Sequence, residues 1–202
     1  MKPFVVLSLL TGLLLSAACD GGSSSSVDGG GGTSVLGGNL DPAVLEACRD
    51  AAGLSFGRCI DDVGAPCTGG EVGTAAFFEA FSADAQLTPV IGPQGSAMFA
   101  LSVRVSGIDP GDPEAVFSPD NPVLEIDLLD ETGTEVVAAY RGRSGFRAVD
   151  GMDGTHENTQ VFVIVDHSIS TIRGEHLRLD ALLTDSAMEH RCGSLAFQAG
   201  AE

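Results

Sequence analysis

Positive charge and long hydrophobic runs are both scarce in this chain of 202 residues. Ten Lys and Arg oppose 28 Asp and Glu, which gives a formal net charge of -18. This excludes a sequence-independent nucleic-acid binder, because such proteins neutralise phosphates with basic side chains. The longest apolar run has 12 residues, whereas a membrane-spanning helix needs about 20. Hydrophobic residues, in contrast, make up 44% of the chain, a fraction too high for a wholly disordered protein.

The first eighteen residues have the features of a secretory signal peptide. Lys2 supplies a positive start, the apolar run covers residues 4–15, and the small residues 16–18 precede Cys19. This order of charge, short apolar run and small residues is typical of a cleavable export signal. We therefore expect residues 1–18 to be removed.

The stretch LLSAAC, which ends at Cys19, resembles the lipobox of bacterial lipoproteins. The resemblance implies that Cys19 becomes the lipidated N-terminus of a protein held on a membrane in the extracytoplasmic part of the bacterial cell envelope. Ser16 stands where that family usually has Leu, and secretion after ordinary signal-peptide cleavage is the alternative. The mature chain would carry nine Arg, no Lys and 28 acidic residues, a net charge of −19.

Residues 19–39 are expected to be the lipidated cysteine followed by a flexible linker. Eight Gly and five Ser occur in residues 20–39, and such a composition buries too little apolar surface to fold. The folded domain is therefore predicted to span residues 40–202, with a disulfide-stapled helical segment at 40–70.

The cysteines support this division, because removing Cys19 from five leaves an even set. In an exported chain four cysteines predict two disulfides, here among Cys48, Cys59, Cys67 and Cys192. We expect Cys67–Cys192 and a local Cys48–Cys59 bridge, because the first and last strands of a sandwich often lie side by side. A metal site is the alternative, although no C-x-x-C pair is present.

A short helix is predicted at the start of the domain. Asp41 is a good N-cap, Pro42 suits the first helical position, and Gly53 is a natural stop. The helical spacing places Cys48 on the face toward the domain. The following residues, 54–70, are rich in Gly, Asp and Pro and are predicted to form an irregular loop.

From Val72 onward the hydrophobic pattern changes to the period of two that is typical of strands. It predicts strands at 74–81, 96–106, 122–129, 135–141, 159–166, 176–184 and 191–197. About seven strands without a long amphipathic helix indicate an all-β, antiparallel β-sandwich, with a β-barrel as the alternative. The architecture is expected to be immunoglobulin-like only, since the Trp of true immunoglobulin domains is missing. The run at 159–166 is expected to be a central strand covered on both faces.

Three short stretches of the domain are similar to uncharacterised lipoproteins of myxobacteria-type bacteria. These are VIGPQGS at 90–96, YRGR at 140–143 and RCG at 191–193. The resemblance implies an exported β-sandwich lipoprotein and brings no activity or functional residues with it.

Two acidic loops are the best candidates for a ligand site. Calcium prefers oxygen ligands from flexible loops, and the candidate ligands are Asp109, Asp112, Glu114, Asp150, Asp153 and Glu157. The alternative is a set of ordinary solvated turns, because Asp, Gly and Pro favour turns. Three arginines, Arg141, Arg143 and Arg147, form either an anion site or surface ion pairs.

Catalytic motifs are missing. There is no G-x-S-x-G elbow around Ser144, and His156, His167, His176 and His190 lack metal-ligand spacing. We therefore expect no catalytic residues and no cofactor apart from the calcium alternative. The predicted function is a non-enzymatic binding or structural role, with the membrane as one partner and a protein or glycan as another. A calcium-dependent adhesion module and an extracytoplasmic hydrolase are the alternatives.

Overall fold

A computed structural model describes residues 38, 40–49, 53–60, 77–92, 94–165 and 169–200. The predictions for the signal peptide, Cys19, Cys67, His167 and nearly all of the linker lie outside these residues. Among the described residues, no helix has the length and apolar character needed to cross a membrane.

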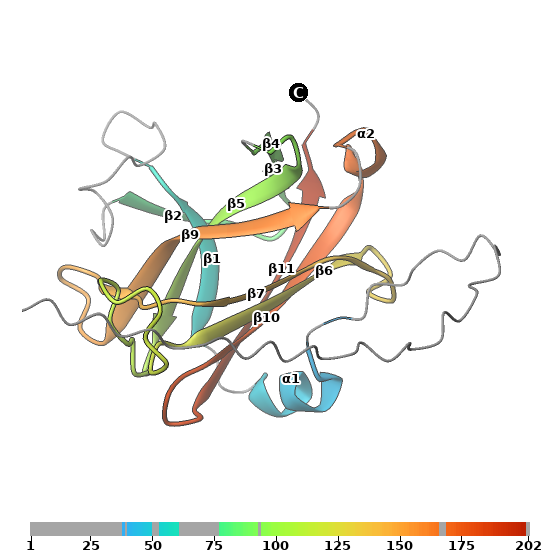
Figure 1. Cartoon of the computed structure of the whole chain (residues 1–202). Coiled ribbons are helices and arrows are strands. Elements are labelled where there is room, and N and C mark those ends of the chain that lie inside the picture. The colour runs from blue at the N-terminus through green and yellow to red at the C-terminus, as the bar shows by residue number, and fades with distance from the viewer. Residues whose placement is uncertain are drawn as a thin grey trace, which may run out of the picture. The chain divides into compact units, whose positions relative to one another are not determined.

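Two short helices and eleven strands make up the described fold (Figure 1). In chain order the first elements are α1 (Pro42–Cys48), β1 (Leu54–Cys59), β2 (Phe78–Ala80), β3 (Ala85–Leu87), β4 (Val90–Ile91), β5 (Ala97–Ser106) and β6 (Val123–Asp130). The remaining elements are β7 (Val136–Arg143), β8 (Arg147–Ala148), β9 (Thr155–Val165), α2 (Ile169–Ile172), β10 (His176–Thr184) and β11 (His190–Ala199).

The strands form two sheets, which confirms a sandwich-like, all-β fold. One sheet has the order β2-β1-β5-β9-β8, with β4 pairing with the end of β5. The other has the order β3-β11-β10-β6-β7. All pairs are antiparallel except β3 and β11, which run parallel and correct the expectation of a purely antiparallel fold.

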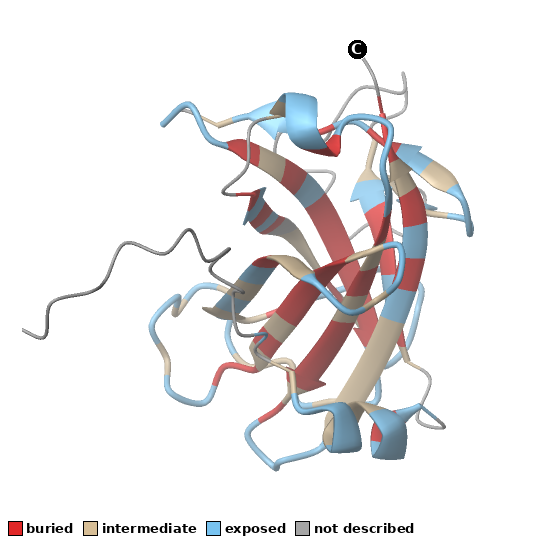
Figure 2. Ribbon diagram, turned by 90° about the vertical axis from the view of Figure 1, so that its right-hand side faces the viewer, coloured by how far each residue is buried: buried red, intermediate tan, exposed pale blue. Residues whose placement is uncertain are grey.

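The core lies between the two sheets, and alternating residues supply it (Figure 2). Phe99, Leu101, Val103 and Val105 of β5 are almost fully buried, as the alternation predicts. On the facing sheet the fully buried side chains are those of Leu124, Ile126, Leu128, Leu179, Leu183 and Phe197. The rings of Phe99 and Phe197 meet edge to face, with centroids 5.1 Å apart, which joins the sheets directly.

The N-terminal segment corrects two predictions. Helix α1 begins as predicted, with the Asp41 side chain accepting a hydrogen bond from the Ala43 N–H at 2.8 Å, but it ends at Cys48 instead of continuing to Gly53. Residues 54–59, predicted as loop, form β1 between β2 and β5. The pattern of β1 is broken by Gly57, and the strand is stabilised by its two neighbours more than by its own alternation.

Strand β9 corrects a third prediction. Val161, Val163 and Val165 are buried against the core, but Phe162 and Ile164 are 41% and 49% exposed on the opposite face. The strand is therefore covered on one face at these positions, and its continuous apolar run leaves large side chains in solvent.

Candidate binding surface at one end of the sandwich

Three loops lie at the same end of the two sheets (Figure 1). They are residues 107–122 between β5 and β6, residues 149–154 between β8 and β9, and residues 185–189 between β10 and β11. The Gly107 N–H donates to the carbonyl of Gly154 at 3.3 Å, which joins the first two loops. We name these three loops the loop end.

Asp185 organises the third loop and joins it to the first. Its side chain is buried, and one carboxylate oxygen accepts the N–H groups of Ala187 and Glu189, both at 2.9 Å. The other oxygen accepts the N–H of Asp109 at 2.9 Å. Ser186 donates in return to the Asp109 carboxylate at 2.8 Å. This bond, followed by that from the Gly111 N–H, lowers the pKa of Asp109.

Asn121 holds the long loop 107–122 from inside. It is fully buried, its side-chain oxygen accepts the Asp112 N–H at 2.7 Å, and its side-chain N–H donates to the Ala115 carbonyl at 2.9 Å. Gly145 packs against this loop so closely that a Cβ would lie 2.3 Å from the Asp112 backbone. Arg143 also donates to the Asn121 carbonyl at 2.7 Å. The loop is therefore held in one conformation by buried polar groups.

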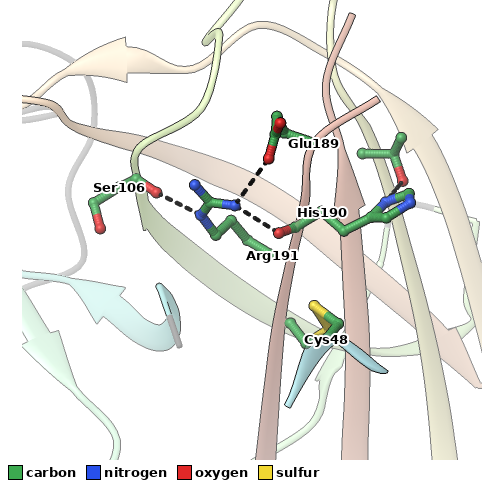
Figure 3. Close-up of a disulfide and its surroundings, with 7 residues drawn as sticks. Cys48, Ser106, Glu189, His190 and Arg191 are labelled. Carbon is green, nitrogen blue, oxygen red and sulfur yellow. Dashed lines mark hydrogen bonds and ion pairs between the residues drawn. A yellow bond between two sulfur atoms is a disulfide. The ribbon is translucent and has the colours of Figure 1, made fainter. Parts of the chain in front are cut away.

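Arg191 fixes the base of the loop end (Figure 3). Its guanidinium donates to the carbonyls of Ser106, Gly107 and His190, and its Nη1 lies 3.8 Å from the Glu189 carboxylate. Since Ser106 is the last residue of β5, these bonds connect the start of β11 to the start of loop 107–122.

Each of the three loops exposes a large apolar side chain. Phe117 is 96% exposed and Val116 is 57% exposed at the tip of the first loop. Met152 of the second loop is 41% exposed, and Met188 of the third is 70% exposed with a φ of 65°. A non-glycine residue in this left-handed region is uncommon and is found most often in tight or functional turns.

A disulfide lies beside the third loop. Cys48 of α1 is bonded to Cys192 of β11, so the predicted pairings Cys67–Cys192 and Cys48–Cys59 are wrong. The reason is topological, because β1 lies in the other sheet and α1 packs beside β11. Cys59 is also disulfide-bonded.

Four of the six predicted calcium ligands, Asp109 among them, have partners within the domain. Asp112 accepts the Glu114 N–H at 2.9 Å, and Glu114 pairs with Arg147 at 2.9 Å. Glu157 is buried, with one oxygen 2.9 Å from Arg104. The two acidic loops do meet at the loop end, but within the described residues no group of three or more His, Cys, Asp or Glu is placed to hold a metal ion.

Four of the other candidates also have structural partners. Arg141 pairs with Glu125 at 3.3 Å, and Arg143 donates to backbone carbonyls of loop 107–122. The Ser144 hydroxyl accepts from Asn158 at 2.6 Å, and His190 bonds the Thr184 hydroxyl at 3.0 Å. For the three arginines these contacts favour ion pairs and turn contacts over an anion site.

Sequence reasoning missed the apolar tips and the residues that hold the loops. Val116 and Phe117 stand as an isolated apolar pair between acidic turn residues, which was the available signal. Asn121 and Asp185 gave none, because Asn and Asp are ordinary turn residues. The bond from Asp109 to Asp185 also joins positions 76 residues apart. The comparisons with family models, with curated proteins and with solved structures find no match for this chain.

Proposed function

We propose that this chain is a membrane-anchored, extracytoplasmic lipoprotein whose sandwich domain binds a protein partner through the loop end. The lipid on Cys19 and the Gly/Ser-rich linker hold the domain near a bacterial membrane. The role is binding and not catalysis. The arguments for the anchor are the LLSAAC stretch and the even number of cysteines that remain without Cys19.

We also propose that the sandwich is immunoglobulin-like in architecture. The strand order supports this, because the order β1-β5-β9-β8 in one sheet matches the strand order in one sheet of an immunoglobulin domain. In the second sheet, β11, β10, β6 and β7 take the order of the other layer. In immunoglobulin variable domains, loops clustered at one end of such a framework form the binding surface.

The observation that carries the binding proposal is the exposure of Phe117 on a loop that is held rigid. Burying a Phe side chain contributes about 1.5–3 kcal/mol of favourable free energy. Phe117 is exposed in the free domain, so a partner that covers it would gain this free energy on binding. Because Asn121 and Asp185 already fix the loops, a partner would find the surface preorganised and would lose little conformational entropy on binding. Aromatic side chains that a partner buries carry much of the binding energy in many protein interfaces.

Partner capture from native membranes tests the binding proposal. The bait is the mature domain with its linker, and the test variant is Phe117→Ser. Ile164→Ser is the matched control, because Ile164 is a half-exposed apolar residue on a sheet face outside the loop end. We expect a partner that the wild type and Ile164→Ser capture and that Phe117→Ser captures at least tenfold less. Equal capture by both variants would rule out the loop end.

Membrane fractionation tests the anchor. We expect the full chain to partition with membranes and a Cys19→Ser variant to lose this association or to remain unprocessed. A Cys19→Ser chain that is processed and still held on the membrane would contradict lipidation at this residue.

A further inference from the structure

An open groove of about 470 Å³ lies between α1 and the start of β11. One wall is made by Ala43, Val44 and Ala47 of α1, and the other by residues 188–191. The groove has the volume of sites that bind small ligands or a few side chains. Met188, the exposed apolar residue of the third loop, is one of the lining residues, so the groove adjoins the loop end.

Both walls of the groove are fixed. Cys48, the only buried residue of α1, is bonded to Cys192 of β11. The Leu40 N–H, just before the helix, donates to Asp127 of β6 at 3.1 Å. On the other wall, Asp185 and Arg191 hold Glu189 and the neighbouring backbone. The disulfide and the hydrogen bond of Leu40 therefore hold α1, one wall of the groove, in place.

Of the two charged residues that line the groove, Glu189 is the more exposed. The guanidinium of Arg191 is engaged by backbone carbonyls, and the His190 ring is bonded to Thr184. Glu189, in contrast, is 66% exposed in its side chain and only loosely paired, 3.8 Å from Arg191. An apolar groove with an exposed carboxylate at its edge is complementary to an apolar side chain next to a cation.

We infer that this groove receives an apolar side chain of the partner, and that a neighbouring Lys or Arg of the partner pairs with Glu189. This inference rests on the proposed binding function and names the chemistry of the partner segment. A negatively charged segment is disfavoured, because Glu189 would repel it in a chain whose net charge is already -18.

The test is an NMR titration of the ¹⁵N-labelled mature domain with two capped peptides, Lys-Leu-Leu-Lys and Glu-Leu-Leu-Glu. We expect the basic peptide to shift the amides of residues 43–48 and 188–191, and the acidic peptide to bind at least tenfold more weakly. Shifts spread over the acidic surface, or equal binding of both peptides, would overturn the inference.

Three variants make the test specific. Ala47 is exposed, so Ala47→Trp fills the groove without loss of buried contacts. This variant should weaken binding of the basic peptide about tenfold. The control variant Ala47→Ser should leave the binding unchanged. Glu189→Gln should weaken binding of the basic peptide about two- to fivefold, as expected for an exposed ion pair. Unchanged affinity in Ala47→Trp would contradict the groove as the site.

The disulfide gives an independent control. A Cys48→Ser, Cys192→Ser double variant should keep the amide spectrum of the core strands and lose peptide binding, because the α1 wall is no longer fixed. Full binding by the double variant would contradict the role of α1.

If Phe117→Ser abolishes capture while the peptide does not bind the groove, the proposed function stands and this inference fails. If the peptide binds the groove and capture does not depend on Phe117, this inference stands and the proposed role of the loop end fails.

Discussion

At the scale of single residues, Asp130 shows how a turn is built from side-chain hydrogen bonds. Its carboxylate accepts the Thr132 hydroxyl at 2.5 Å and the N–H groups of Glu135 and Thr134 at 3.0 and 2.9 Å. The bond from Thr132, followed by that from Glu135, lowers the pKa of Asp130 to about 2. Gly133, with a φ of 70°, completes the turn.

This carboxylate predicts a pH dependence. A lowered folded-state pKa stabilises the fold above the unfolded value of about 3.9, and this contribution is lost as the pH falls toward about 2. A ¹³C titration of the carboxyl groups should find the Asp130 midpoint near 2. In Thr132→Val the midpoint should move upward, toward the value of an ordinary Asp. A wild-type midpoint near 3.8 would contradict this account of the turn.

Arg104 and Glu157 form a buried ion pair between β5 and β9. The side chains are 10% and 1% exposed, and the Arg104 guanidinium stacks over the Phe78 ring at 4.1 Å from its centroid. Alternation places Arg104 on the face of β5 opposite the core, as predicted. Its burial was not predictable, because β2 is distant in the sequence.

Breaking this pair should be costly. We predict that Glu157→Ala lowers the free energy of unfolding by about 3–5 kcal/mol, because the buried guanidinium of Arg104 loses its ion pair with Glu157. The exposed pair of Arg58 and Glu79 is the control, and Glu79→Ala should cost less than about 1 kcal/mol. Denaturant unfolding measures both values, and equal losses would contradict the difference in burial.

At the scale of elements, the sequence predicts the strands in which apolar and polar residues alternate clearly. It misses the strands that form only because they pair with neighbouring strands. The strands at 96–106, 122–129 and 176–184 match β5, β6 and β10 within two residues at each end. β3, β4 and β8 have two or three residues each, too few to show a period. Their existence depends on pairing with β11, β5 and β9, which is long-range information.

The Cys48–Cys192 disulfide predicts a second stability difference. It joins residues 144 positions apart, so in the chain-entropy model it stabilises the fold by about 5 kcal/mol. We expect the Cys48→Ser, Cys192→Ser double variant to lose a large part of this in thermal unfolding while α1 becomes the first segment to exchange its amide protons. An unchanged melting temperature would show that α1 contributes little to the folded state.

The loop end predicts a local effect of Asp185. Asp185→Ala removes an acceptor of three backbone N–H groups, from Asp109, Ala187 and Glu189. Leaving such groups unpaired costs about 1–3 kcal/mol each when they stay buried. Hydrogen exchange should therefore speed up at these amides and remain slow in β5 and β10. Unchanged exchange at Asp109 would contradict the bond between the loops.

At the scale of the whole molecule, composition indicated an acidic, exported, disulfide-bonded β domain, and the described residues contain a sandwich-like fold with a disulfide. The pairing of the cysteines was not predictable, because it depends on which sheet receives the N-terminal segment. The same holds for the proposed binding surface. Phe117 is separated from Met188 by 71 positions in the chain, and only the fold brings their loops to one end.

The central claim is that the loop end binds a partner, and site-specific photocrosslinking tests it most directly. Phe117 is replaced by p-benzoylphenylalanine in the full chain, and Phe162, an exposed Phe on a sheet face, is replaced in the control. Irradiation of intact cells should give a discrete crosslinked adduct from position 117 and none from position 162. No adduct from position 117, or the same adduct from both positions, would contradict the claim.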